Sequence, residues 1–472
     1  MRAHKVHLIG ICGTAMASLA GMLKARGFEV RGSDAAAYPP MSDFLSSLEI
    51  PVMQPFSEEN FAWEPDLVVV GNAISRGNVE LEHVLDRRLH FTSMAQLVYD
   101  EFIQGRQSLV VAGTHGKTTT TSMLAWIFQV AGREPSFLIG GIAENFGSSF
   151  AVTNGREFII EGDEYDTCFF DKGPKFWHYF PDAVALTSVE FDHADIYRDL
   201  EAVKWAFKRL VNLVPKRGVI VAWDGSENVS ECVERALCKV ERYGFGESAH
   251  WRIVDLKHQS NATCWNVLRN GERWAQLEFP LAGDYNVLNA TAAAAIAANY
   301  GIAPGVIAKA LASFESVKRR LEVKAELDGI TIIDDFAHHP TAIAATLGAL
   351  RSRYNGRRLV AVLEPRSNTL RRNVFQHELV ESLAKADEVV LASVFFKTTD
   401  SLRPEERLDV EAVVRELVAR GVRARQLASA DEISMALSSE LHSGDVVALL
   451  SNGGFGGIYE KLPKAIRAYR ER

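Results

Sequence analysis

A glycine-rich turn between a predicted strand and a predicted helix constrains the fold of this chain more than any other feature. The turn spans Gly113 to Gly116, follows the apolar run 108–112 and leads into Lys117 and a helical pattern. Backbone N–H groups in such a turn point inward, and the start of the helix adds positive potential, so phosphates bind there. The turn therefore predicts a nucleotide-binding α/β domain.

The side chains after the turn indicate which nucleotide it holds. Lys117 can reach the outer phosphates of ATP, and the Thr118 hydroxyl suits a Mg²⁺ ion. Position 111 is Val, so the full pattern G-x-x-x-x-G-K-T is not met. An incidental glycine-rich turn is the alternative, but the strand–turn–helix context favours phosphate binding. The predicted phosphate-binding residues are Gly113, Thr114, His115, Gly116, Lys117, Thr118 and Thr119.

Alternating strands and helices recur in three sections of the chain, and 472 residues are too many for one hydrophobic core. Such alternation predicts parallel sheets covered by helices. We place one boundary near Gly105, just before the first strand of the second section, and another around Ser316–Lys318. We therefore expect three α/β domains, over residues 1–106, 107–316 and 317–472.

Composition excludes several classes of protein. The net charge of −8 argues against a nucleic-acid or anionic-membrane surface. Five cysteines without a CxxC pair indicate reduced thiols, and neither a signal peptide nor an apolar run of about eighteen residues is present. We expect a soluble cytoplasmic protein.

Carboxylates follow a second apolar strand, Phe158–Ile160. At the carboxyl end of a strand beside a phosphate loop, such groups can hold a metal by oxygen. Surface loops are also often acidic, so we assign the metal role to Glu161, the first residue after the strand. His193 ends another predicted strand in an acid-rich turn, and we expect it to hold a second cation. Two cations offset the charge of ATP and of a developing acyl phosphate.

The first section opens with a strand and a turn, Gly10 to Gly13, that resemble a dinucleotide fingerprint but depart from it. Cys12 and Ala15 stand where glycine is expected. The turn indicates a diphosphate at a helix start, with Asp34 available for a ribose or base. A nucleotide-dependent oxidoreductase is the alternative, and the missing glycines speak against it.

Two further groups of polar residues stand near predicted element ends. Asn286 and Asn289 share one face of a predicted helix; an amide there can pair with adenine or simply cap the helix. In the third section a set of polar residues clusters near strand ends, and Arg366 could grip a carboxylate with two hydrogen bonds. The set, a predicted substrate wall, comprises Arg320, Asp335, His338, His339, Glu364, Arg366 and Asn368.

Together these motifs resemble the bacterial Mur ligase family along nearly the whole chain. GTHGKTTTT, EGDEYD, FDHAD, NVLNATAA, KRRLE and DDFAHHPT stand in the family's order. EFDHADIY, VLEPRSNT and SNGGFGGI are similar to the branch that attaches L-alanyl-γ-D-glutamyl-meso-diaminopimelate to UDP-N-acetylmuramate. The resemblance implies a Rossmann-like first domain, a central P-loop ATPase-type domain and a Rossmann-like third domain.

The resemblance also implies roles for particular residues. Lys117, His193 and Arg320 would be catalytic, while Asn289, Arg320 and Asp335 would join the phosphate loop at ATP. The metal ligands would be Thr118, Glu161 and His193, holding two Mg²⁺ ions. The UDP moiety would contact Gly13, Thr14, Ala15, Met16, Ser33 and Asp34. The peptide would contact His338, His339, Glu364, Arg366 and Asn368.

The implied reaction is ATP-dependent amide formation through an acyl phosphate, by a cytoplasmic monomer active in peptidoglycan recycling. Ligation of L-alanine to UDP-N-acetylmuramate is one alternative, and a nucleotide-gated binding protein without turnover is another. Tyr285 departs from the family, which usually has His there. Many relatives carry a carbamylated lysine near the metals, and Lys204 and Lys208 are both available for that role.

Overall fold

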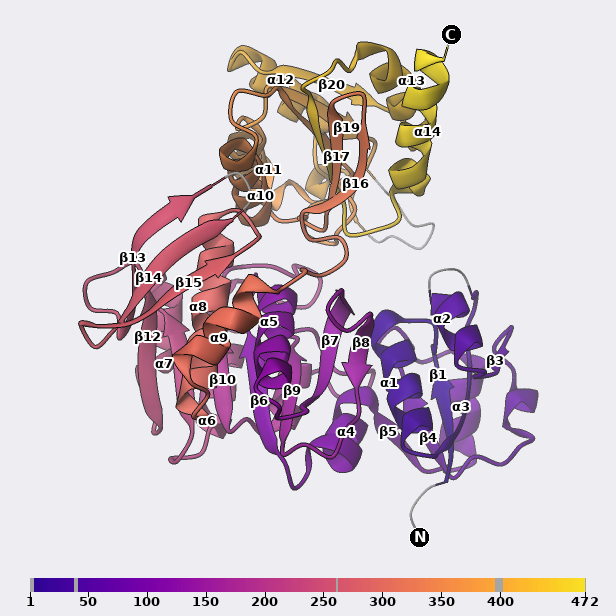
Figure 1. The fold of residues 1–472 in the computed structure, drawn as a ribbon. Helices are drawn as coiled ribbons and strands as arrows, with labels where there is room; N and C mark the ends of the chain where they lie inside the picture. Colours follow the sequence, from indigo (N-terminus) through magenta and orange to yellow (C-terminus); the bar gives the residue numbers. More distant parts are fainter. Residues whose placement is uncertain (1–3, 38–40, 260–261, 395–401, 472) are drawn as a thin grey trace.

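Each of three segments of the chain folds around its own β-sheet (Figure 1). The structure is a computed structural model that describes residues 4–37, 41–259, 262–394 and 402–471. The described helices include none that is long and apolar enough to cross a membrane. The expected class, three α/β domains with parallel sheets, is confirmed.

The N-terminal sheet has the strand order β3-β2-β1-β4-β5, and all its strand pairs are parallel. This order places the two crossovers on opposite sides of β1, which is the arrangement of doubly wound nucleotide-binding folds. Its elements are β1 Lys5–Ile9, α1 Thr14–Ala25, β2 Glu29–Ser33, α2 Met41–Ser47, β3 Val52–Met53, β4 Leu67–Val70, α3 Val79–Asp86, β5 Phe91–Ser93 and α4 Met94–Val98.

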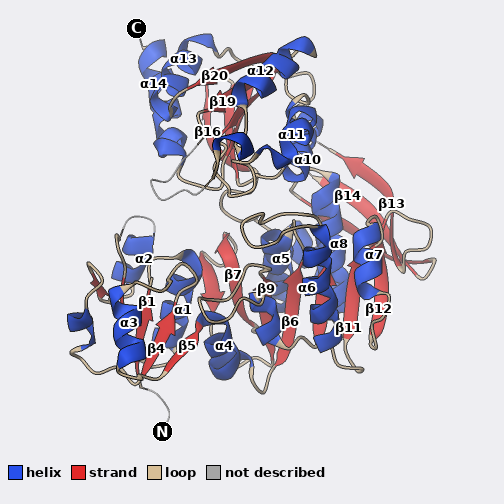
Figure 2. Cartoon of the chain, turned by 180° about the vertical axis from the view of Figure 1, so that it is seen from behind, coloured by secondary structure: helices blue, strands red, loops and turns tan. Residues whose placement is uncertain are grey.

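The central sheet has ten strands in the order β15-β14-β13-β12-β11-β10-β6-β9-β7-β8. Helices α5, α8 and α9 cover one face (Figure 1), and α6 and α7 cover the other (Figure 2). Its strands are β6 Gln107–Ala112, β7 Ser136–Ala143, β8 Ser148–Ala151, β9 Glu157–Gly162, β10 Ala183–Leu186, β11 Val219–Trp223, β12 Lys239–Gly244, β13 Trp251–His258, β14 Thr263–Arg269 and β15 Glu272–Phe279. Its helices are α5 Lys117–Val130, α6 Leu200–Leu213, α7 Glu227–Val233, α8 Asp284–Asn299 and α9 Pro304–Ala312.

The C-terminal sheet has the order β16-β17-β21-β18-β19-β20, and only its edge strand β16 runs antiparallel to its neighbour. It lies over the loops at one end of the central sheet in both views (Figures 1 and 2). Its strands are β16 Glu322–Leu327, β17 Ile330–Asp335, β18 Leu359–Leu363, β19 Glu388–Ala392, β20 Arg423–Leu427 and β21 Val446–Leu450. Its helices are α10 Pro340–Arg353, α11 Gln376–Leu383, α12 Val410–Ala419, α13 Ala430–Glu440 and α14 Ile458–Arg470.

A fully buried carboxylate joins three parts of the N-terminal domain. Glu80 on α3 accepts hydrogen bonds from the Ser33 hydroxyl and from Asn60 Nδ2 at 2.6 Å, and its Oε2 lies 3.3 Å from His7 Nε2. Burial alone would raise the pKa of Glu80, but these three partners lower it. The domain core therefore depends on one ionised acid with a full set of donors.

Replacing this carboxylate tests that dependence. Glu80→Leu leaves the buried donors without an acceptor, and we expect it to destabilise the domain by about 3 kcal/mol or more. Hydrogen–deuterium exchange should then quicken in β1 and β2. The matched control is Glu82→Leu on the same helix, because Glu82 pairs at the surface with Arg76. Unchanged protection in Glu80→Leu would contradict the assignment.

Candidate functional site

The glycine-rich turn lies where β6 ends and α5 begins, as predicted. Gly113 has φ of 136° and Gly116 has φ of 79°, both in the left-handed region that favours glycine. A side chain on Gly113 would approach Ser188 N to 2.7 Å and also meet the Thr187 hydroxyl. The loop is tied to the segment after β10, because Thr114 N donates to Ser188 O at 2.9 Å.

Lys117 is the centre of charge in this loop. Its Nζ donates to Gly113 O at 2.7 Å and to Thr114 O at 3.2 Å, and it lies 2.8 Å from Glu164 Oε2. Burial would lower the pKa of Lys117, but the charges of Glu164, Asp163 and Glu161 raise it. The ammonium therefore stays charged at a loop built for phosphates.

Glu161 stands at the end of β9, on the strand next to β6. Its Oε1 accepts from Thr118 Oγ1 at 3.0 Å, and its Oε2 accepts from Gly140 N at 2.8 Å. Burial is the largest influence on the pKa of Glu161, and the pKa is raised in spite of Lys117. A carboxylate and a hydroxyl that face each other, with negative charge in excess, fit a Mg²⁺ ion, which prefers oxygen ligands.

His193 pairs with Glu164 and not with Glu161. Its Nε2 lies 3.0 Å from Glu164 Oε1, and the Tyr197 hydroxyl donates to Glu164 O at 2.7 Å. Burial would lower the pKa of His193, but Glu164 raises it. In this structure His193 is thus the partner of a carboxylate that also binds Lys117, and its role as metal ligand stays a prediction.

The C-terminal domain brings Arg320 to the phosphate loop. Arg320 Nη2 donates to Thr118 Oγ1 at 3.4 Å. Asp335 is buried, and its carboxylate accepts from Leu321 N at 2.8 Å and from Ala337 N at 2.9 Å. Asp335 therefore fixes the backbone next to Arg320, and its predicted contact with nucleotide would have to compete with these bonds.

The two asparagines of α8 have different surroundings. Asn286 is buried and donates to Ala282 O at 2.8 Å, so its amide supports the start of the helix. The Asn289 amide lies against Gly116, where any Cβ would collide with its Oδ1. Asn289 is therefore the one of the pair that borders the phosphate loop, and its pairing with adenine stays a prediction.

The predicted UDP site divides into exposed and buried residues. Gly13, Thr14 and Ala15 are exposed at the start of α1, where a diphosphate can approach. Met16 and Ser33 are buried, at 6% and 0% exposure, and their contact with the UDP moiety stays a prediction. Asp34 Oδ2 accepts from Cys12 N at 2.8 Å and holds the turn.

The predicted peptide residues gather where the C-terminal and central domains meet. Asn368 Nδ2 donates to Asp195 Oδ2 at 2.7 Å and to the Tyr165 hydroxyl at 3.1 Å. His339 Nε2 lies 3.3 Å from Phe191 O. The Nδ1 of His338 lies 2.8 Å from Phe336 O, and burial lowers its pKa. These residues border one interdomain surface, although their groups are occupied by protein partners.

Glu364 and Arg366 form the remaining part of the predicted substrate wall. Arg366 Nη1 donates to Glu364 Oε1 at 3.3 Å, and the Ser451 hydroxyl donates to Glu364 Oε2 at 2.5 Å. A side chain on Gly453 would collide with the Arg366 guanidinium. The Ser–Asn–Gly–Gly turn thus makes room for Arg366, and the contact of either residue with peptide stays a prediction.

Lys204 is unsuited to carbamylation in this arrangement. Its Nζ lies 3.0 Å from both Glu201 Oε1 and Glu231 Oε2, and these hydrogen bonds raise its pKa. Carbamylation requires a neutral amine, which two carboxylates disfavour. Lys208 is half exposed, and its Nζ lies 3.9 Å from the same Glu231. The carboxylates that pair with these lysines are Glu201 and Glu231, and not Glu161.

Several residues at the site were not assigned a role from sequence. Lys175 pairs with Asp163 at 2.7 Å, and the Thr369 hydroxyl donates to Asp192 at 2.6 Å across the two domains. Asp163 and Asp192 belong to acidic runs that the motifs contain. Thr369 ends the motif VLEPRSNT, whereas Lys175 lies outside the motifs and carries no local signal.

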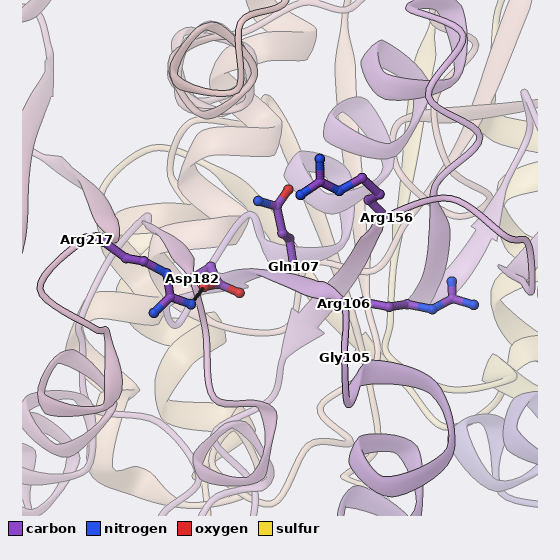
Figure 3. A pocket seen from close by; sticks show the side chains of 6 residues that line it. All are labelled: Gly105, Arg106, Gln107, Arg156, Asp182 and Arg217. Atoms are coloured by element: carbon purple, nitrogen blue, oxygen red, sulfur yellow. Dashed lines mark hydrogen bonds and ion pairs between the residues drawn. The ribbon is translucent and has the colours of Figure 1, made fainter.

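A cavity of about 310 Å³ lies at the opposite end of the central sheet (Figure 3). It is lined by Gln107 and Asp182, at the starts of β6 and β10, and by three arginines. Arg217 is turned to Asp182, with Nη2 2.6 Å from Oδ1, and Arg106 points away to Ser136. The arginines do not converge, so this cavity is not the phosphate site.

The fold and site define a nucleotide-binding α/β protein of three domains with a phosphate loop, an oxygen-rich cation position and an arginine supplied by the third domain. The chain matches the Mur ligase family catalytic domain over residues 5–102, the Mur ligase middle domain over 111–297 and the Mur ligase glutamate ligase domain over 319–453. It belongs to the Mur ligase family and is an ATP-dependent ligase that forms an amide bond.

Individual relatives cover nearly the whole chain. A UDP-N-acetylmuramate–L-alanyl-γ-D-glutamyl-meso-2,6-diaminoheptanedioate ligase of Escherichia coli strain K12 is 41% identical, with 97% of each chain covered. A UDP-N-acetylmuramate–L-alanine ligase of Lachnoclostridium phytofermentans is 30% identical, again with 97% of each covered. The crystal structure of a murein peptide ligase from Psychrobacter arcticus has a TM-score of 0.74 at 34% identity, with 98% of each chain covered.

The geometry of the loop predicts the effect of Gly113→Ala. The left-handed φ and the collision with the segment after β10 should cost about 1–3 kcal/mol, or roughly a 5- to 150-fold loss of ATP affinity. Titration calorimetry with Mg²⁺ and a non-hydrolysable ATP analogue measures this. Gly132→Ala is the control, because Gly132 also has positive φ, at 72°, but open space around it. Equal affinities in both variants would contradict the loop assignment.

Proposed function

We propose that the chain joins UDP-N-acetylmuramate to L-alanyl-γ-D-glutamyl-meso-diaminopimelate, with ATP hydrolysed to ADP and phosphate, in peptidoglycan recycling. The choice of acceptor rests on sequence identity, which is higher with relatives named for this peptide than with relatives named for L-alanine. Relatives named for this peptide are 41% and 39% identical, whereas three named for L-alanine are 29–31% identical. The site described above supports the ATP-dependent step for either acceptor.

In the first step the muramate carboxylate attacks the γ-phosphate of ATP, and ADP leaves. Lys117 would exchange its carbonyl partners in the loop for phosphate oxygens. Arg320, near the Thr118 hydroxyl, would add a second positive charge on the other side. Fixed positive groups around a transferred phosphoryl group stabilise the charge that develops on its oxygens.

Thr118 and Glu161 would hold Mg²⁺, and His193 would approach a second ion after leaving Glu164. When bound, the ions supply charge neutralisation at the phosphates. That the chain binds two ions, and that it works as a monomer in the cytoplasm where ATP is available, also belongs to this proposal. Glu161 is already oriented by Gly140 N for such a role.

In the second step the amine of the peptide attacks the acyl phosphate, and phosphate leaves as the amide forms. Water must be kept out, because it would hydrolyse the acyl phosphate. Hydrogen bonds between the domains, from Asn368 to Asp195 and from Thr369 to Asp192, would help to hold the domains together during this step. Closure of this kind protects reactive intermediates in many enzymes.

A panel of acceptors tests the proposal. With UDP-N-acetylmuramate and ATP present, ADP release is measured with L-alanine, dipeptide, tripeptide and tetrapeptide. We expect kcat/KM for the tripeptide to exceed that for L-alanine by roughly a hundredfold or more, because a site built for polar contacts rejects substrates that leave them unmade. Preference for L-alanine would overturn the choice of acceptor, and ADP release independent of any amine would leave a nucleotide-gated binding protein.

Removing the loop ammonium tests the mechanism. Lys117→Ala should lower kcat by roughly 10²–10³, because one fixed charge at the phosphoryl group is lost. Amide formation is followed by chromatography of the nucleotide product. Lys216→Ala is the control, since Lys216 is exposed just before β11, at the other end of the same sheet. Full activity in Lys117→Ala would contradict the scheme.

A further inference from the structure

Two histidines and a glutamate meet at the boundary of the central and C-terminal domains. His115 Nε2 lies 3.3 Å from Glu190 Oε2, and His339 Nδ1 lies 3.9 Å from the same oxygen. The ring centroids of the two histidines are 4.8 Å apart. Within the described part of the chain, this is the one group of three His, Cys, Asp or Glu residues whose donor atoms all lie within 4.8 Å of each other.

The backbone holds each of the three residues in place. His115 N donates to Ser188 Oγ at 2.9 Å, and Glu190 N donates to Thr114 Oγ1 at 2.9 Å, so the loop and the segment after β10 are tied together. His339 is the N-cap of α10, where its ring accepts from Thr341 N at 3.3 Å. Their proximity therefore follows from the fold and not from flexible side chains at the surface.

The hydrogen bonds of His339 place its proton on Nε2 and its electron pair on Nδ1, the nitrogen nearer Glu190. Its Nε2 lies 3.3 Å from the carbonyl oxygen of Phe191, which can only accept, so Nε2 carries the proton. Nδ1 is then unprotonated, and its electron pair accepts the hydrogen bond from Thr341 N, with Glu190 Oε2 3.9 Å away. A backbone carbonyl that fixes the far nitrogen of an imidazole is the usual outer partner of metal-binding histidines. Binding of a cation here needs an unprotonated nitrogen on each imidazole and an ionised Glu190.

We propose that His115, Glu190 and His339 bind a transition-metal cation of the zinc class, and that this ion ties the C-terminal domain to the phosphate loop. Two nitrogens and one oxygen suit Zn²⁺, with bonds of about 2.0–2.2 Å and water as the fourth ligand. Donors around such an ion lie roughly 3.3 Å apart. The His115–Glu190 pair already has this spacing, at 3.3 Å. His339 Nδ1 must approach Glu190 from 3.9 Å, and it must exchange its bond from Thr341 N for the ion, because both use the same electron pair.

The site is chemically distinct from the position between Thr118 and Glu161. That position offers oxygen, which Mg²⁺ prefers, whereas this one offers mostly nitrogen. It also takes ligands from two domains, so an ion there stabilises their contact. The Thr341 hydroxyl, which donates to Glu190 Oε2 at 2.7 Å, would remain as a bond to the ligand carboxylate.

Cobalt is the probe, because Co²⁺ replaces Zn²⁺ and absorbs visible light when four-coordinate. Full-length protein is titrated with Co²⁺ in excess Mg²⁺, without nucleotide, so the result does not depend on turnover. We expect one ion per chain, bound at least about tenfold more weakly in Glu190→Gln and His339→Asn. His339→Asn keeps a good N-cap and removes the imidazole, which guards against unfolding.

Glu161→Gln is the matched control, since it alters the oxygen site and leaves this group intact. Binding that survives in Glu161→Gln and weakens in the other two variants supports the proposal. Binding lost in Glu161→Gln but kept in Glu190→Gln places cobalt at the magnesium position and overturns it, as does the absence of four-coordinate absorption. Zn²⁺ should also raise the melting temperature of the wild type and of Glu161→Gln, but not of Glu190→Gln.

Discussion

The burial of one ammonium among three carboxylates organises the rest of this structure. Lys117 would be costly to bury alone, and Glu161, Asp163 and Glu164 keep it charged. Three carboxylates outnumber the one ammonium, and two of them have further partners: Lys175 pairs with Asp163, and His193 pairs with Glu164. Without substrate, these charged groups pair with one another and keep the cluster in place. When ATP and a divalent cation bind, Lys117 can pair with the phosphates and Glu161 with the cation.

Strand order explains why these groups meet. β6 lies between β9 and β10, with Val111 opposite Glu161 on one side and opposite Ala185 on the other. The phosphate loop therefore has the acids after β9 on one flank and the segment from Glu190 to His193 on the other. Parallel strands bring their carboxyl ends to one edge, which is where such folds bind ligands. Arg320 and His339 of the third domain contact this edge of the central sheet and complete the site.

Local signals predicted much of this arrangement. The loop from Gly113 to Thr119 could be predicted from sequence because its glycines, its lysine and the start of the helix are adjacent in the chain. The burial of Met16 and Ser33 could not be predicted from the motif, because a ligand-binding turn and the core share the same few residues. The partnership of Lys175 with Asp163 could not be read at all, since it depends on how a loop after β9 folds back.

Interdomain geometry is the other part that sequence could not supply. Asn368 and His339 were expected to contact a peptide, and the structure shows them bonded to Asp195, Tyr165 and Phe191. The same polar groups can serve in domain contact and in peptide binding. When no substrate lies between the domains, buried donors and acceptors still need partners, and the protein supplies them. A bound substrate would replace each of these interdomain hydrogen bonds by one of its own, so separating the domains would cost little free energy. A site of this kind can close tightly over an acyl phosphate and still release its product.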